Sequence, residues 1–274
     1  MTTTRRVTTP DGVELSVTDA GDGPVVLLVH GFPELAHSWR RQVAALADAG
    51  YRVLAPDMRG YGASDRPEVV TDYDIDHLTG DLVALLDDVG ATQAVVVGHD
   101  WGSIVAWELA ARHPAHVRTL TALSVPHPRA FGAALRDVDV QRAKSTYMQF
   151  FRSDPAKAAA VLLADGAAAL RQVYGDDVHH RDVEEYVEHF SEPGALEASL
   201  YWYAAMGHMD TPEVHLPTTF VWGADDVAIG EVAARGCAEF CTGPYEFRPL
   251  EGRGHWLPDQ DPDAVVDAIL ARAG

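Results

Sequence analysis

Short apolar runs alternate with amphipathic stretches through residues 1–125. The apolar runs predict buried strands, and the run at 13–18 also alternates as a half-exposed strand does. We expect strands over residues 13–18, 25–30, 51–57, 94–98 and 117–125, with helices over 38–49, 76–89 and 102–113 between them. Strands that alternate with helices predict an α/β fold, in which a mostly parallel sheet is covered on both faces.

The pattern changes after residue 125. Residues 126–216 contain no convincing strand and are Ala-rich, charged and helical, with breaks at Pro155, Gly175 and Pro193. Alternation then resumes, with strands expected at 217–223 and 245–250 and helices at 230–240 and 262–273. We therefore predict one α/β core, residues 1–125 and 217–274, interrupted by a helical lid, residues 126–216.

Composition restricts the partners of such a protein. Acidic residues outnumber basic ones by 41 to 21, which gives a net charge of −20. Such a chain repels nucleic acid and anionic lipid, so we expect neither as a partner and an uncharged small molecule as the substrate. The two cysteines are too few for a disulfide framework. The polar N-terminus lacks an apolar signal segment and no apolar run is long enough to span a membrane, so we expect a cytoplasmic location.

The central chemical signal is the segment Gly98-His99-Asp100-Trp101-Gly102, between a predicted strand and a predicted helix. This arrangement is typical of a nucleophile elbow, a sharp turn that exposes its middle side chain. Serine is usual there, but the residue here is Asp100. A carboxylate forms an ester with an alkyl carbon, which suits displacement at carbon. The alternative is an ordinary glycine-rich loop in which Asp100 caps the helix.

The loop after the predicted strand at 25–30 fits such an elbow. His30-Gly31-Phe32-Pro33-Glu34 directly follows a predicted strand, where this type of fold supplies one oxyanion-hole N–H. The expected donors are the backbone N–H groups of Phe32 and Trp101, and the Phe32–Pro33 bond is a candidate for the cis form.

The predicted base is His255, on the loop after the last strand. Its partner is expected after the strand at 217–223, where the spacing from Gly223 favours Asp226 over Asp225. The chain order of nucleophile, acid and histidine is that of the hydrolase arrangement.

Together these segments resemble the epoxide hydrolases of the α/β-hydrolase superfamily. HGFPE, YRVLAPDMRGYGASDRP, GHDWGS, WGADD and GRGHW match that family in order and approximate spacing, from about residue 5 to the end. The resemblance implies that water opens an epoxide to a vicinal diol through an ester on Asp100, without a metal or organic cofactor. It also implies two lid tyrosines that bind the epoxide oxygen, Tyr147 and Tyr203, with Tyr201 as the neighbour that could be mistaken for the second.

Several alternatives remain open at this point. Haloalkane dehalogenases share the Asp nucleophile but typically carry Asn where this chain has Phe32. Enzymes for anionic haloacids carry Arg after the nucleophile, and none follows Asp100 here. A third class comprises ligand-binding or natural-product-modifying proteins of this fold. Glu34 either positions the hydrolytic water, as a like-placed Glu does in relatives, or is a solvated residue at a helix start. The pair His179-His180 lacks a third ligand at metal-binding spacing, and both a monomer and a homodimer fit the sequence.

Overall fold

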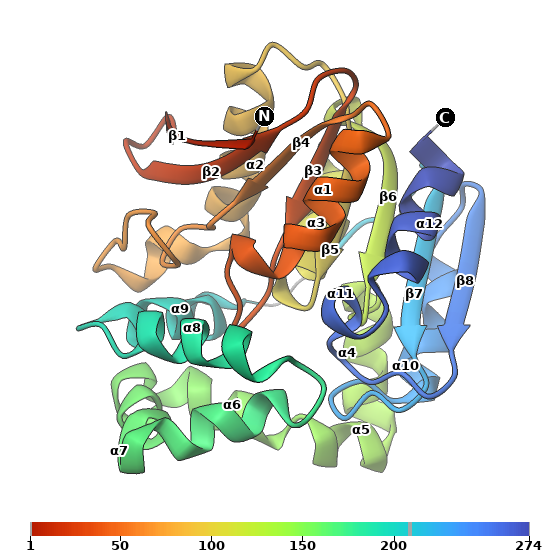
Figure 1. The fold of residues 1–274 in the computed structure, drawn as a ribbon. Helices are drawn as coiled ribbons and strands as arrows, with labels where there is room; N and C mark the ends of the chain where they lie inside the picture. The colour runs from red at the N-terminus through yellow and green to blue at the C-terminus, as the bar shows by residue number, and fades with distance from the viewer. Residues whose placement is uncertain (1, 208–209, 274) are drawn as a thin grey trace.

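A computed structural model describes residues 2–207 and 210–273 of the chain. Its centre is an eight-stranded sheet in the order β1-β2-β4-β3-β5-β6-β7-β8. β1 and β2 are antiparallel to their neighbours and the other pairs are parallel, so the predicted fold class is confirmed (Figure 1). The strands are β1 (Thr2–Thr8), β2 (Glu14–Ala20), β3 (Val25–Val29), β4 (Arg52–Pro56), β5 (Ala94–His99), β6 (Val117–Leu123), β7 (Thr218–Gly223) and β8 (Tyr245–Leu250).

Helices cover both faces of this sheet, because its central strands are apolar on both sides. Every residue of β5 is buried. One face packs against α1 and α12, and the other against α2, α3 and α10 (Figure 1). The helices outside the 126–216 segment are α1 (Arg40–Asp48), α2 (Ile75–Asp88), α3 (Trp101–Arg112), α10 (Glu231–Gly236), α11 (Leu257–Gln260) and α12 (Pro262–Ala273), with short 3₁₀ helices η1 (Ala36–Trp39), η2 (Val70–Tyr73), η3 (Pro114–His116) and η4 (Cys237–Phe240).

The remaining helices form one insertion between β6 and β7. They lie beyond the carboxyl ends of the parallel strands, at the bottom of Figure 1. α7 is interrupted at residues 164–167, where the backbone leaves the helical conformation. The inserted helices are α4 (Pro128–Asp137), α5 (Asp139–Lys144), α6 (Thr146–Ser153), α7 (Pro155–Tyr174), α8 (His180–Phe190) and α9 (Ala195–Ala205). The division of the chain into core and lid remains a prediction.

The structure differs from the predicted elements in two places. β1 was not expected, because its sequence TTTRRVT has almost no apolar residue and only Val7 is buried. As an edge strand it needs little apolar surface, since backbone pairing with β2 along its whole length supplies its order. The helix expected over 230–240 is wrong in its second half, where α10 gives way to the 3₁₀ helix η4.

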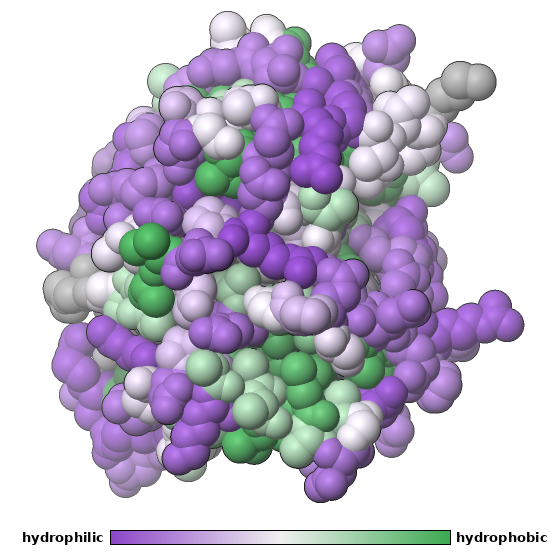
Figure 2. All heavy atoms as spheres, turned by 90° about the vertical axis from the view of Figure 1, so that its left-hand side faces the viewer, coloured by the Kyte–Doolittle hydropathy of each residue, from purple (hydrophilic) through white to green (hydrophobic). Residues whose placement is uncertain are grey.

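The face of the molecule that Figure 2 shows is largely hydrophilic. Figure 2 shows hydrophobic side chains gathered mainly in the lower part of one face, at the level of the inserted helices. Val161 of α7, for example, is 49% exposed. Within residues 2–207 and 210–273, no helix combines the length and the hydropathy that crossing a bilayer would require.

Candidate active site

Asp100 sits on the sharp turn between β5 and α3. Its φ of 52° lies in the left-handed region, which residues other than glycine seldom adopt. Two glycines make the turn possible: a Cβ at Gly98 would lie 2.1 Å from the carbonyl oxygen of Gly102, and one at Gly102 would lie 2.1 Å from that of Val29. The expected elbow geometry is therefore present, and strain of this kind is common at functional sites.

The loop after β3 reaches the same carboxylate. The N–H of Phe32 donates to Oδ1 of Asp100 at 2.8 Å, across 68 positions of sequence. Trp101 is the first residue of α3, where an N–H has no partner within the helix. The Phe32–Pro33 bond is cis, as anticipated. Both predicted oxyanion donors thus lie beside the predicted nucleophile.

His255 and Asp226 complete the group. The ends of β7 and β8 are neighbours in the sheet, so the loops that follow them meet. Nδ1 of His255 lies 2.9 Å from Oδ2 of Asp226, and Nε2 lies 3.3 Å from Oδ2 of Asp100. All three side chains are buried, Asp226 being only 2% exposed. The structure brings Asp226, rather than Asp225, next to His255, as the spacing from Gly223 predicted.

The ionisation of these groups is coupled. Burial opposes the charged form of Asp100, but hydrogen bonds from His255 and from the Phe32 N–H, together with the attraction of His255, lower its pKa below the ordinary value. Burial likewise opposes the charged form of His255, but the attraction of Asp226 and the contact with Asp100 raise its pKa well above the ordinary value. The contact between the two groups therefore favours the carboxylate form of Asp100 and the imidazolium form of His255.

The lid tyrosines lie over this group. The ring of Tyr203, on α9, is 5.0 Å from that of Trp101 and 5.5 Å from that of Phe32. Tyr147, on α6, lies 6.4 Å from Tyr203 and is 37% exposed. Tyr201 faces another way, since its hydroxyl donates to Glu197 at 2.9 Å. The structure thus brings Tyr203, and not Tyr201, beside the elbow.

Both tyrosines are held in the protonated form. Burial, the proximity of the other tyrosine and the Asp100 carboxylate raise the pKa of Tyr203 well above its ordinary value. Burial and the same carboxylate raise the pKa of Tyr147. Each hydroxyl therefore remains a hydrogen-bond donor at neutral pH.

Three further buried residues, Glu34, His99 and Ser124, form hydrogen-bond contacts next to the site. Glu34 is fully buried and its Oε2 lies 2.8 Å from Nδ1 of His99, so the alternative of a solvated residue is wrong. His99 Nε2 lies 2.9 Å from the carbonyl oxygen of His255, and the hydroxyl of Ser124 donates to the same oxygen at 2.7 Å. His99 and Ser124 were not singled out from the sequence, although His99 stands inside the elbow motif.

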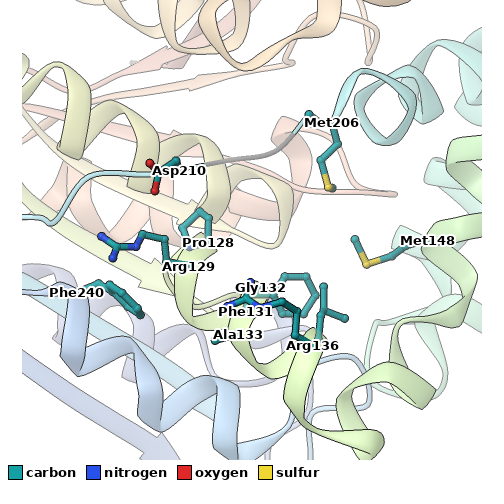
Figure 3. A pocket seen from close by; sticks show the side chains of 12 residues that line it. Pro128, Arg129, Phe131, Gly132, Ala133, Arg136, Met148, Met206, Asp210 and Phe240 are labelled. Atoms are coloured by element: carbon teal, nitrogen blue, oxygen red, sulfur yellow. The ribbon is translucent and has the colours of Figure 1, made fainter.

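A cavity of about 410 Å³ lies between α4, Met148 and Met206, and its mostly apolar wall also carries Arg129, Arg136 and Asp210 (Figure 3). Phe131, Met148, Met206 and Phe240 contribute to its wall. Met148 directly follows Tyr147, and the N–H of Met206 donates to the carbonyl of Tyr203 at 3.3 Å. The described residues that line the cavity do not include Asp100, His255, Tyr147 or Tyr203.

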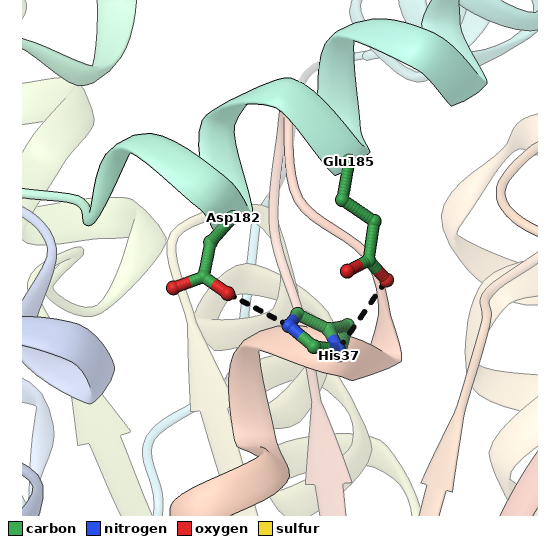
Figure 4. A group of neighbouring side chains, drawn as sticks. All are labelled: His37, Asp182 and Glu185. Carbon is green, nitrogen blue, oxygen red and sulfur yellow. Dashed lines mark hydrogen bonds and ion pairs between the residues drawn. The ribbon is translucent and has the colours of Figure 1, made fainter.

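One cluster of metal-ligand type joins the core to the insertion. Nε2 of His37 lies 2.9 Å from Asp182 and Nδ1 lies 3.3 Å from Glu185 (Figure 4). Arg40 pairs with the other oxygen of Asp182. Since the two carboxylates face different ring nitrogens and Asp182 already has a cationic partner, the cluster fits an ion-pair bridge better than a metal site. This cluster does not include His179 or His180. That these two histidines bind no metal remains a prediction.

Comparison with known proteins agrees with this geometry. The sequence matches the model of the α/β hydrolase fold family over residues 24–262. It is 36% identical to epoxide hydrolase A of Mycobacterium tuberculosis, over 97% of this chain and 96% of that protein. The crystal structure of epoxide hydrolase A from Mycobacterium thermoresistibile superposes with a TM-score of 0.87 at 33% identity, covering 99% of this chain and 98% of the other. A structure from a study of metagenomic epoxide hydrolases from hot environments gives 0.90 at 29% identity, covering 100% and 99%. The chain therefore belongs to the α/β-hydrolase fold family, in the group whose members are named epoxide hydrolases.

Proposed function

We propose that this chain is an epoxide hydrolase with Asp100 as its covalent nucleophile. The observation that carries the proposal is a carboxylate, rather than a hydroxyl, on the elbow, aligned with His255 and facing two protonated tyrosines. A hydroxyl nucleophile would suit acyl transfer, whereas a carboxylate suits attack on an alkyl carbon.

The first half-reaction opens the ring. A carboxylate oxygen of Asp100 attacks one ring carbon, the carbon–oxygen bond breaks, and its electron pair goes to the departing oxygen. Tyr147 and Tyr203 donate to that oxygen, and one of them supplies its proton. This support matters because an alkoxide is a strongly basic leaving group.

The second half-reaction releases the diol. After esterification, His255 passes its proton to the tyrosinate that the first half-reaction left. The neutral ring, oriented by Asp226, then takes a proton from water, and the resulting hydroxide attacks the carbonyl carbon of the ester. The N–H groups of Phe32 and Trp101 stabilise the oxyanion that forms. The intermediate collapses to the carboxylic acid of Asp100 and the alkoxide of the diol, the acid proton passes to that alkoxide, and Asp100 returns as a carboxylate beside the imidazolium. Glu34, through His99, is placed to influence where that water binds.

The surroundings favour an apolar, uncharged epoxide. The rings that surround the reacting position belong to Phe32, Trp101 and Tyr203. We propose that the cavity next to Met148 and Met206 accommodates the substituent of the ring. No metal or organic cofactor takes part in this scheme. Location in the cytoplasm, the monomeric or homodimeric state and the absence of nucleic-acid or membrane partners remain predictions.

The test is diol formation from a panel of terminal and aryl epoxides, with halide release from haloalkanes as the counter-screen. The wild type should form diol, Asp100→Ala should form none, and His255→Gln should accumulate a protein whose mass is increased by that of one epoxide. Halide without diol would instead assign the chain to the haloalkane dehalogenases. Full activity in Asp100→Ala would refute the nucleophile.

A further inference from the structure

Helix α5 of the insertion packs against the loop that carries Asp226. Gln141 of α5 is only 1% exposed, so its amide has no access to solvent. Its Nε2 donates to the carbonyl of Ala228 at 2.8 Å, and its Oε1 accepts from the N–H of Gly230 at 2.8 Å. One buried side chain therefore bonds two backbone groups of this loop, a carbonyl and an N–H.

The same short loop fixes the acid. Oδ1 of Asp226 accepts from the N–H groups of Ala228 at 2.7 Å and Ile229 at 2.9 Å, which leaves Oδ2 to face His255. Ala228 thus binds Asp226 through its N–H and Gln141 through its carbonyl. A shift of this residue would alter both bonds at once.

Lys144 adds a second contact one helical turn later. Its Nζ donates to the carbonyl of Asp226 at 2.6 Å. Lys144 is one of only two lysines in the chain, the other being Lys157. Both ends of the Asp226 loop are consequently attached to α5, whose residues lie more than 80 positions away in sequence.

We propose that Gln141 is a positioning residue, which from the inserted helices sets the direction in which Asp226 faces His255. The inference rests on the proposed function, because it assigns Asp226 to the orientation of the base. Gln141 acts through the loop and does not touch the reacting atoms.

The two half-reactions should respond differently to its loss. Alkylation needs Asp100 and the tyrosines, whereas hydrolysis of the ester also needs His255 in the orientation that Asp226 imposes. A misplaced acid should therefore lengthen the life of the ester while leaving its formation almost unchanged. A purely structural role would weaken folding or slow both steps together.

The experiment compares Gln141→Met with Gln149→Met, since Gln149 is exposed on the neighbouring helix α6. Single turnovers with styrene oxide are quenched over time, and the esterified fraction is measured by intact-protein mass spectrometry. Ester decay should slow about tenfold or more in Gln141→Met, because small misplacements of catalytic groups are costly. Its rate of formation should stay within about twofold of the wild-type rate.

Further variants distinguish a loss of positioning from a folding defect. Gln141→Glu keeps the acceptor for Gly230 but, when ionised, loses the donor to Ala228, so it should slow ester decay while remaining folded by circular dichroism. Lys144→Met should also slow ester decay, but less strongly, because it removes only one of the three hydrogen bonds between α5 and the Asp226 loop. Equal slowing of both half-reactions, or no change in ester decay, in the folded variants would overturn the positioning role. A wild type that forms neither ester nor diol would refute the proposed function itself.

Discussion

The carboxylate of Asp100 is held by the N–H of Phe32 on one oxygen and faces the ring of His255 with the other. The negative charge of Asp100 helps to hold His255 in its protonated form. Esterification removes that charge, so the pKa of His255 must fall as soon as the first half-reaction ends. The chemistry itself thus converts His255 from an imidazolium into the base that the second half-reaction needs.

This coupling can be measured in the resting protein. His255 should titrate at a higher pH than the ordinary histidine value of about 6.5, and Asp100→Asn, which mimics the loss of charge on esterification, should lower its pKa. The sign follows because removing an anion destabilises the imidazolium. Histidine ring NMR signals followed against pH, with assignment from His255→Gln, give the measurement. An unchanged or higher pKa in Asp100→Asn would contradict the coupling.

The lid tyrosines offer a matched pair of substitutions. Tyr203→Phe should lower the alkylation rate by about 10²-fold, because the leaving oxygen loses a proton donor. Tyr201→Phe should change it by no more than about twofold, since its hydroxyl bonds Glu197 instead. Stopped-flow tryptophan fluorescence during alkylation distinguishes the two. The reverse order of effects would assign the role to Tyr201.

Much of the site could be predicted residue by residue, because Asp100, Asp226 and His255 stand in short motifs at the ends of strands. Contacts made across the fold could not. Gln141 reaches Ala228 over 87 positions and Ser124 reaches His255 over 131, and no local pattern reports such pairings. One of the two interpretations of Glu34, a solvated residue at a helix start, was wrong for the same reason, because the burial of Glu34 depends on its contact with His99 in another loop.

At the scale of elements, the C-terminal end of α7 contacts two catalytic loops. The hydroxyl of Tyr174 donates to the carbonyl of Pro33, next to the oxyanion donor Phe32. Its ring lies 5.4 Å from that of Trp256, which follows His255. A helix that is interrupted at residues 164–167 nevertheless ends at a defined place, because these two contacts fix its last turn.

Tyr174→Phe tests this contact. The variant leaves the buried carbonyl of Pro33 without this donor, so the free energy of unfolding should fall by about 1–3 kcal/mol. Tyr186→Phe is the matched control: its ring stacks on Tyr174 at 5.6 Å, and its buried hydroxyl has no partner among the described residues. Urea unfolding should show a loss for the first variant and almost none for the second. Equal losses would show that the Pro33 bond is not the cause.

Strands were predicted more accurately than helices, for a physical reason. A strand buried on both faces reads as a short apolar run, so β3 to β7 were placed within two residues of their observed bounds. β1 carries no such run, because pairing on one edge is enough to hold it. The inserted helices were recognised as helical without individual bounds, since short helices that meet at sharp turns leave only a weak periodic signal.

Across the whole molecule, acidic residues exceed basic ones and give a net charge of −20. Arg40 pairs with Asp182 of the insertion and with Asp259 of the core, but at least 20 carboxylates have no basic counterpart in one-to-one pairing, because only 21 Lys and Arg are available for 41 acids. Mutual repulsion among the excess acids should therefore oppose the compact state.

Salt should relieve that repulsion. Raising NaCl from about 10 mM to about 150 mM shortens the Debye length from roughly 30 to 8 Å, so the temperature of thermal unfolding should rise. Differential scanning calorimetry at pH 7 measures it. The choline salt of the same anion is the control for a sodium-specific effect. A fall in the unfolding temperature would mean that the attractive pairs between core and insertion outweigh the repulsion.

The position of His255 also matters while the chain is being made. β8 is the outermost parallel strand of the sheet and precedes the base near the C-terminus, whereas the elbow and the Phe32 loop are synthesised far earlier. On the ribosome, a partly emerged chain that folds from its N-terminus would hold its nucleophile before its base exists. An epoxide that reached such a chain could be captured but not released. A chain in which β8 has not yet joined the sheet would therefore bind an epoxide covalently but would lack the base that releases the diol.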